Sequence, residues 1–304
     1  MDTAPRGPTS LRSNRVLALL AGARFAHFAA ATLLFGLAAF PFYAPEPQPL
    51  TLRLPRWLDG CALLALITGV VALMATAANM GGGLGSAVDP QVLSAAVTDT
   101  DFGRVWVARL ALAVLILVLR AVRRPAKDIL LLGLSGLLLM SIALTGHGDI
   151  PGGVLGALHQ SADAVHLLAA GWWIGGLLAL VLSIGPVTDQ TPRLLQRFSG
   201  IGYWAVAAIV GTGVFKSFIL IATPSALAST PYGQVLLLKV ALFMVMGVLA
   251  LSNRFWITPA LAKPGDQHIW FRRLRAQVAV EFTVGLLVLA VAGVLGAMQP
   301  PATL

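Results

Sequence analysis

The sequence predicts an all-α membrane protein in which residues 1–304 form a single transmembrane bundle of about eight helices. Hydrophobic residues make up 58% of the chain and charged residues only 11%, whereas soluble domains carry about a quarter charged residues. Apolar runs of about 20 residues recur, and one helix needs that length to cross the hydrocarbon core of a bilayer. The single cysteine, Cys61, excludes both a disulfide framework and a metal cluster held by thiolates.

Eight apolar runs are the predicted spans, and segments rich in proline and glycine separate them. Their approximate bounds are 16–41, 58–79, 103–121, 128–146, 158–183, 198–222, 233–256 and 277–298. The first run follows a basic tail but is too long for a signal peptide, so we interpret it as a retained span. The connections contain no recognisable soluble domain, nucleotide-binding fingerprint or internal repeat.

The net charge of +9 indicates membrane topology rather than nucleic-acid binding, because the basic residues sort by the ends of the spans. The basic residues in one set of connections are Arg53, Arg56, Arg120, Arg123, Arg124, Lys127, Arg193, Arg197, Arg254, Lys263, Arg272, Arg273 and Arg275. The opposite set, with the N-terminal tail, has only Arg6, Arg12, Arg15 and Arg104. Cytoplasmic connections carry the excess of Lys and Arg, so both termini are predicted to face outward. The arginines of the tail argue for the reverse orientation.

Several ionisable residues fall within or at the ends of the predicted spans, where such groups are costly and usually face a polar interior. They are Arg24, His27, Arg109, His147, His159, Asp163, His166, Lys216, Lys239 and Glu281. In the predicted orientation nearly all of them lie in the outer half, which predicts a polar cavity open to the outside. Glu281 is the exception, near the cytoplasmic end of the last span. For Glu281 we favour structural pairing with an arginine such as Arg254 over a role in proton coupling.

The segment TGHGDIPGGVLGALHQSADAVH, residues 145–166, holds three of the five histidines in the chain. His159, Asp163 and His166 share one helix face, because side chains four and seven residues apart line up along a helix. Asp163 can accept a hydrogen bond from either imidazole, a common arrangement around metal ligands. His159 and His166 are about 10 Å apart along the axis, too far to bind one ion together, and His147 could approach either.

Histidines accompanied by a few methionines suit copper in an oxidising compartment. Met140 lies on the same face as His147, and Met80 ends the second span on the outer side, so both are candidate additional ligands. His27 is a further candidate. The alternative for each histidine is a packed side chain bonded to a backbone carbonyl, and His27 has no motif around it.

Four basic side chains within the spans would repel a metal ion if they lined its path. They are Arg24, Arg109, Lys216 and Lys239. Snorkelling to the headgroups, pairing with Asp163 or backbone carbonyls, and an anionic ligand or chelate are three open explanations. Lys216 and Lys239 could also have structural or coupling roles. We interpret three tryptophans as residues of the interfacial belt: Trp57, Trp106 and Trp256.

The combination of several motifs resembles the copper resistance protein D (CopD) family of bacterial inner-membrane proteins. The motifs are TGHGD (145–149), LHQSADAVHLLAAGWWIGGLLAL (158–180), YGQVLLLKVAL (232–242), NRFWITPAL (253–261) and VEFTVGLLVLAVAGVL (280–295), and the resemblance covers most of the chain. It implies an eight-span bundle with both termini outside and copper movement across the inner membrane, usually described as uptake. It carries over His147 and His166, with His159 one turn before Asp163, and implies a separate periplasmic copper chaperone of the CopC type.

From these residues and this resemblance we predict a copper transporter of the bacterial inner membrane, not an enzyme. Copper, as Cu(I) or Cu(II), would bind at His147, His159 and His166, and the expected partners are lipid, copper and the chaperone, not nucleic acid. One alternative is a b-type cytochrome, in which His27 and His166 hold a haem between helices. Another is a copper-handling or assembly subunit that transports nothing itself.

Overall fold

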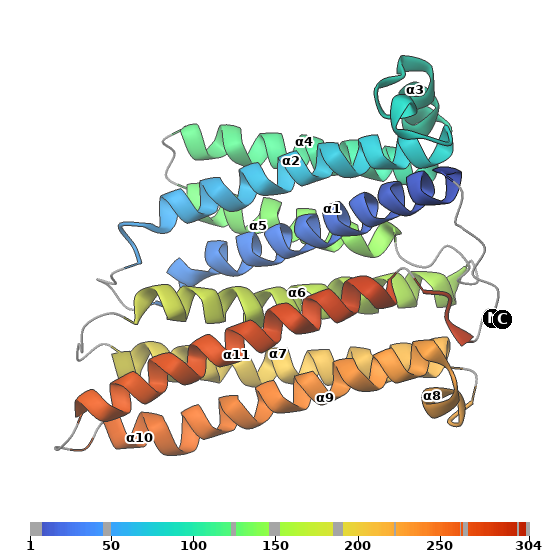
Figure 1. The fold of residues 1–304 in the computed structure, drawn as a ribbon. Coiled ribbons are helices and arrows are strands. Elements are labelled where there is room, and N and C mark those ends of the chain that lie inside the picture. The colour runs from blue at the N-terminus through green and yellow to red at the C-terminus, as the bar shows by residue number, and fades with distance from the viewer. Residues whose placement is uncertain are drawn as a thin grey trace.

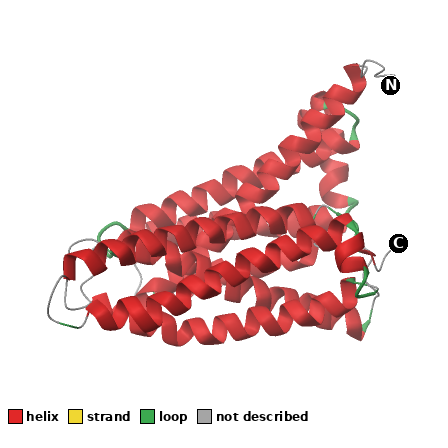
Figure 2. Cartoon of the chain, turned by 60° about the horizontal axis from the view of Figure 1, so that its bottom comes forward, coloured by secondary structure: helices red, strands yellow, loops and turns green. Residues whose placement is uncertain are grey.

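The computed structural model describes residues 8–44, 50–122, 126–145, 153–184, 191–221, 223–261, 263, 267–296 and 298–301. Within these ranges every regular element is a helix, and no strand is present (Figure 2). Eight of the helical segments are long and apolar enough to cross a membrane. The predicted all-α transmembrane bundle is therefore confirmed.

The long helices are α1 (Pro8–Ala39), α2 (Leu54–Met80), α4 (Asp101–Ala121), α5 (Lys127–Met140), α6 (Val154–Ser183), α7 (Thr191–Leu220), α9 (Pro231–Ser252) and α11 (Gln267–Leu295). The 3-10 helices are η1 (Phe40–Phe42), η2 (Leu84–Val88) and η3 (Ser141–Thr145), and η3 extends α5 to the length of a span. After α9 the chain continues through a π-helical turn, η4 (Asn253–Ile257), into α10 (Thr258–Leu261). A short helix, α8 (Ala226–Ser229), precedes α9.

A short helix that is not among the predicted spans, α3 (Pro90–Thr98), lies in the connection between α2 and α4. The sequence contains the signal for this helix. The Asp89 side chain accepts a hydrogen bond from the backbone N–H of Gln91 at 2.9 Å, and Pro90 occupies the first helical position. Asp as the N-cap followed by proline is a common start of a helix.

The last helix begins earlier than the hydropathy pattern predicted, at Gln267 rather than near residue 277. Its first turns are basic and exposed on one side, but Phe271, Leu274 and Val278 are buried at the spacing of a helix face. This buried stripe continues to Glu281. Glu281 therefore lies close to the middle of α11, not near its end as we expected.

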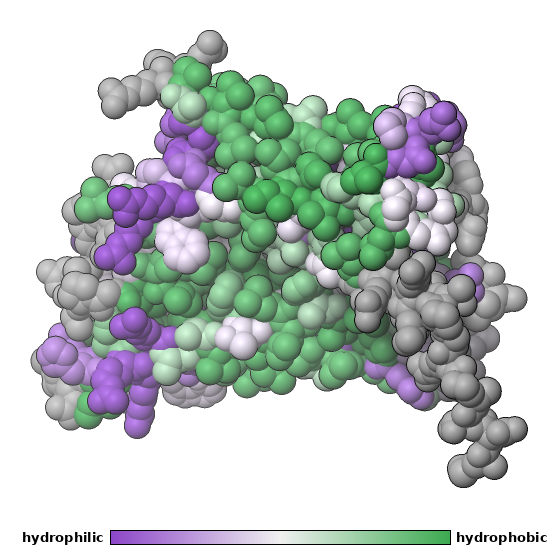
Figure 3. All heavy atoms as spheres, turned by 45° about the horizontal axis from the view of Figure 1, so that its top comes forward, coloured by the Kyte–Doolittle hydropathy of each residue, from purple (hydrophilic) through white to green (hydrophobic). Residues whose placement is uncertain are grey.

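Helix α6 separates two groups of helices, as Figure 1 shows. It contacts α1 and α5 on one side and α7 and α11 on the other, while α2 packs on α1 and α4, and α9 packs on α11. Helix α1 begins and α11 ends at the same end of the bundle, which we call the terminal end. Figure 3 shows apolar side chains across the middle of one face and hydrophilic ones at its two ends, as a lipid-facing surface requires.

The crossing of α1 and α6 brings two backbones into direct contact at Gly36 and Gly175. A Cβ atom added to Gly175 would lie 2.6 Å from the Cα of Gly36, well inside van der Waals distance. Small residues allow such close packing in membranes, where the hydrophobic effect does not draw helices together. Gly175 therefore allows α6 to pack directly against α1.

The carboxylate of Glu281 joins α11 to two other helical segments. Its Oε1 accepts a hydrogen bond from Trp173 Nε1 on α6 at 3.0 Å, and its Oε2 accepts one from Asn253 Nδ2 in η4 at 3.1 Å. Glu281 is 1% exposed. These partners are neutral donors rather than the arginine, such as Arg254, that we expected. Arg254 instead lines, together with Glu281, a smaller cavity of ≈ 180 Å³.

Replacing Gly175 by alanine should destabilise the bundle by roughly 1 to 3 kcal/mol, the usual cost of overpacking. The new Cβ would overlap the backbone of α1, which cannot move aside like a flexible side chain. Thermal unfolding of the purified variant in detergent measures the effect. The matched control is Gly200→Ala on α7, where an added Cβ meets nothing within 4 Å. Equal unfolding midpoints for the two variants would contradict this account of the crossing.

Trp173→Phe should destabilise the protein by about 1 to 3 kcal/mol, because one buried oxygen of Glu281 loses its donor. Glu281→Leu should also destabilise it, since the donors of Trp173 and Asn253 would then have no acceptor. The two substitutions should be less than additive in a double-mutant cycle, because they remove the same hydrogen bond. Additive changes in the unfolding midpoint would show that the two residues are not coupled.

Candidate functional site

A cavity of ≈ 730 Å³ lies at the terminal end of the bundle, between α1, α4, α6, α7, α9 and α11, with η3 also contributing. The ionisable side chains that line it are Arg24, His27, Arg109, Asp163, His166, Lys216 and Lys239. Each of these residues was predicted to lie within a span. Seven of the ten ionisable residues singled out in the sequence therefore line one cavity, and Glu281 lies outside it.

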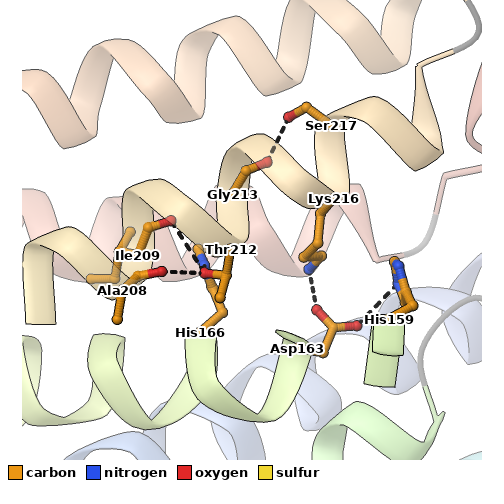
Figure 4. Close-up of polar contacts among 9 residues, drawn as sticks. All are labelled: His159, Asp163, His166, Ala208, Ile209, Thr212, Gly213, Lys216 and Ser217. Atoms are coloured by element: carbon orange, nitrogen blue, oxygen red, sulfur yellow. Dashed lines mark hydrogen bonds and ion pairs between the residues drawn. The ribbon is translucent and has the colours of Figure 1, made fainter. Parts of the chain in front are cut away.

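His166 on α6 is held by a threonine on the neighbouring helix α7. Its Nδ1 lies 2.9 Å from the Oγ1 of Thr212, as Figure 4 shows. The Thr212 hydroxyl is also 2.5 Å from the carbonyl oxygen of Ala208, which can only accept a hydrogen bond. Since Thr212 has one proton and donates it to Ala208, this network assigns the proton of His166 to Nδ1. The Nε2 lone pair is then free to bind a ligand.

His27 on α1 is oriented in the same way by a backbone carbonyl. Its Nδ1 lies 2.9 Å from the carbonyl oxygen of Ala65 on α2, so Nδ1 must be the donor. Its Nε2 is buried and has no hydrogen-bond partner among the described residues. A neutral imidazole can act as a metal ligand when its Nδ1 donates a hydrogen bond and its Nε2 has no other partner.

Asp163 lies one turn before His166 and contacts two basic groups, as Figure 4 shows. It forms an ion pair with Lys216 of α7, and its Oδ2 lies 3.3 Å from Nε2 of His159. The contact with His159 is within ion-pair distance but lacks the geometry of a hydrogen bond. Asp163 therefore pairs with Lys216 and contacts His159, whereas Thr212, rather than Asp163, orients His166.

The guanidinium of Arg109 is 1% exposed and contacts neutral groups at the wall of the cavity. Its Nε donates to Ser141 Oγ at 3.0 Å, and its Nη2 donates to Ser141 O and to Thr145 Oγ1, both at 2.6 Å. The charge also lies 4.5 Å from the ring centroid of Trp106, a cation–π distance.

Trp106 is not an interfacial residue as predicted. It is 2% exposed, and its Nε1 donates to the carbonyl oxygen of Gly69 at 2.7 Å. Its position near the start of α4 suggested that the side chain would lie at the membrane surface. The indole instead lies between α4 and α2 and lines the cavity.

The other predicted site residues that the structure describes do not line the cavity. His147 lies outside the described residues, so the structure gives no position for it. His159 is 1% exposed and does not line the cavity, although it contacts Asp163, which does. Met80 is an exposed residue at the end of α2, and Met140, at the end of α5, is half-buried. Among the described residues, no group of three His, Cys, Asp or Glu side chains could hold a metal ion.

Sequence analysis did not identify Thr212, Ser141 and Thr145 as partners of the site. Thr212 lies four residues before Lys216, so the two share one face of α7. That spacing is visible in the sequence. The pairing of Thr212 with His166 on another helix depends on how α6 and α7 pack, which the sequence alone does not reveal.

Comparisons with known proteins match both halves of the chain to one family. Residues 14–157 match the profile described as "Copper resistance protein D-like, N-terminal domain", and residues 192–295 match the profile "Copper resistance protein D". No solved structure matches the chain.

Three named relatives extend this result. Inner membrane protein YebZ of Escherichia coli is 31% identical, covering 91% of this chain and 97% of the relative. Copper resistance protein D of Pseudomonas syringae pv. tomato is 33% identical over 91% of this chain and 95% of its own. Copper transport protein CutJ of Bacillus subtilis is 32% identical over 86% of this chain, but only 48% of that relative is covered.

Eight apolar helices and an inner-membrane relative identify a multi-pass protein of the bacterial inner membrane. The names of the other two relatives associate it with copper handling. The two profile matches and the identity above 30% along most of the chain show that this protein belongs to the copper resistance protein D family.

Proposed function

We propose that this protein carries copper across the inner membrane, from the periplasm to the cytoplasm, and that the cavity at the terminal end is where copper binds. The observation that carries the proposal is the pair of imidazoles of His27 and His166. The Nδ1 atom of each forms a hydrogen bond, which leaves the Nε2 atom to bind a ligand. Both line the same cavity. Imidazole nitrogen is a good copper ligand, and the family supports copper as the cargo.

His147 and His159, the other two histidines of the predicted site, have separate roles in this proposal. His147, which precedes α6 in the sequence, is the proposed third copper ligand. His159 lies behind Asp163 and acts on the site through that carboxylate. A CopC-type chaperone remains the proposed source of copper on the periplasmic side.

The direction of transport rests on the charge distribution. The connections at the end opposite the terminal end carry most of the basic residues, and cytoplasmic loops are typically the basic ones. The cavity would therefore open towards the periplasm. Copper would enter from that side and leave at the end where α10 lies.

Proteoliposomes containing the wild-type protein should accumulate or release copper at a rate well above that of protein-free vesicles. His166→Ala should lower the flux at least about tenfold, since removing one metal ligand or its support commonly has effects of this size. A copper-sensitive dye enclosed in the vesicles measures the flux. Thermal unfolding shows whether the variant still folds.

The control variant is His268→Ala, which removes an exposed histidine at the opposite end of α11. Its flux should equal that of the wild type. If the wild type moves no copper, with or without a periplasmic chaperone, the protein is not the carrier, and a handling or assembly role is favoured. If His166→Ala transports normally, the carrier role stands and this site is wrong.

A second candidate function, a b-type cytochrome, is favoured by the same pair of histidines. Haem iron can take two axial imidazoles from facing helices of a bundle, and basic residues can hold its propionates. His27 lies on α1 and His166 on α6, and the cavity between them contains both basic and apolar side chains.

The cytochrome hypothesis predicts a strong Soret absorption band from protein purified after haem-replete expression. The band should disappear in both His27→Ala and His166→Ala, since each would remove one axial ligand. A colourless wild-type protein under these conditions rejects the haem hypothesis and leaves copper transport unaffected.

A further inference from the structure

More basic than acidic side chains line the cavity, which is unfavourable for a site that binds a metal cation. Four basic side chains line it, namely Arg24, Arg109, Lys216 and Lys239. Among the described residues that line it, Asp163 is the only acidic one. Counting Asp149, which precedes α6 in the sequence, would still leave four basic residues against two carboxylates.

Pairing within the protein accounts for only one of these charges. Lys216 forms an ion pair with Asp163. Lys239 lies close enough to interact electrostatically with both Asp163 and Lys216, but it forms no ion pair with a described residue. Asp163 thus has two lysines and a histidine around it, so its single negative charge cannot neutralise the cluster.

Snorkelling to the headgroups can explain the charge of Arg24 but not that of Arg109. Arg24 is exposed and lies 5.3 Å above the ring centroid of Phe102, so it can reach the membrane surface. Arg109 is 1% exposed and fixed by Ser141 and Thr145, and it interacts electrostatically with Arg24. Its hydrogen bonds go to neutral oxygens and leave its charge without a counter-ion among the described residues, so an anion in the cavity would stabilise this guanidinium.

We propose that the ligand of this cavity is an anionic chelate, a copper ion carried by a small polycarboxylate, rather than a bare copper ion. The inference rests on the proposed function, because it takes copper as the cargo. The carboxylates of the chelate interact with Lys239, Arg109 and Arg24, and the free Nε2 atoms of His27 and His166 face the metal. Clusters of Arg and Lys select anions in the same way in membrane pores.

The proposal resolves the conflict between the imidazoles and the basic residues. The imidazoles suit a metal ion, and the surrounding charge repels a cation but attracts an anion. A chelate with net negative charge satisfies both sets of side chains, because its metal and its carboxylates lie on different sides. The cavity of ≈ 730 Å³ has room for a ligand much larger than a single ion.

Copper binding by the purified protein in lipid-free detergent tests the proposal. The probes are the copper(II)–citrate complex, copper(II) nitrate in a weakly coordinating buffer, and citrate alone, with affinities measured by isothermal titration calorimetry. Copper–citrate should bind at least about tenfold more tightly than copper nitrate, because complementary charge favours the anion. Its affinity should fall as the salt concentration rises.

Three variants test whether the positive charge of Lys239 favours binding of the copper–citrate complex. Lys239→Gln should weaken copper–citrate binding at least about fivefold, whereas Lys239→Arg, which keeps the charge, should bind like the wild type. Lys263→Gln removes a lysine at the opposite end, between α10 and α11, and should change nothing. The unfolding midpoint of each variant shows whether it is folded.

The outcomes separate this proposal from the proposed function. If copper nitrate binds as tightly as copper–citrate, or if Lys239→Gln strengthens copper binding by removing repulsion, the chelate proposal is overturned while copper binding stands. If neither copper form binds, both proposals fail. If added phosphatidylglycerol abolishes copper–citrate binding, the anion of the cavity is a lipid headgroup, and the chelate proposal is overturned.

Discussion

The cost of placing charged groups in a bilayer is the constraint on which this structure depends. A basic, acidic or imidazole side chain within a span cannot face hydrocarbon without a large penalty, so it faces the interior of the bundle. Seven such side chains from α1, α4, α6, α7 and α9 line one cavity. The helices are arranged so that these groups meet each other, while the buried Glu281 is held separately by Trp173 and Asn253.

Two contacts between helices outside the cavity support this arrangement. The glycine contact between α1 and α6 fixes the distance between the helices that carry His27 and His166. The hydrogen bonds of Glu281 connect α11 to α6 and η4. Thr212 and Ala65 then orient the two imidazoles. The site therefore depends on residues that do not touch the ligand.

The sequence predicted the fold well because each span is marked by its own apolar run and by proline or glycine at its ends. It also predicted that His166, Asp163, Lys216 and Lys239 would share a polar region, since each lies at the same depth in its span. It could not predict that His166 would pair with Thr212, nor that the backbone carbonyl of Ala65 would orient His27. These contacts depend on the rotation of each helix about its axis, which periodicity constrains only loosely. Glu281 was misplaced along its helix because the basic first turns of α11 hide its start from a hydropathy count.

The central claim is that imidazole Nε2 atoms in the cavity at the terminal end bind copper. X-ray absorption spectroscopy at the copper edge, on purified protein loaded with copper, tests it most directly. The account predicts nitrogen neighbours with the multiple-scattering pattern of imidazole, and loss of that pattern when both His27 and His166 are replaced by alanine. A spectrum that is unchanged in this double variant, or one dominated by sulfur neighbours, would contradict it.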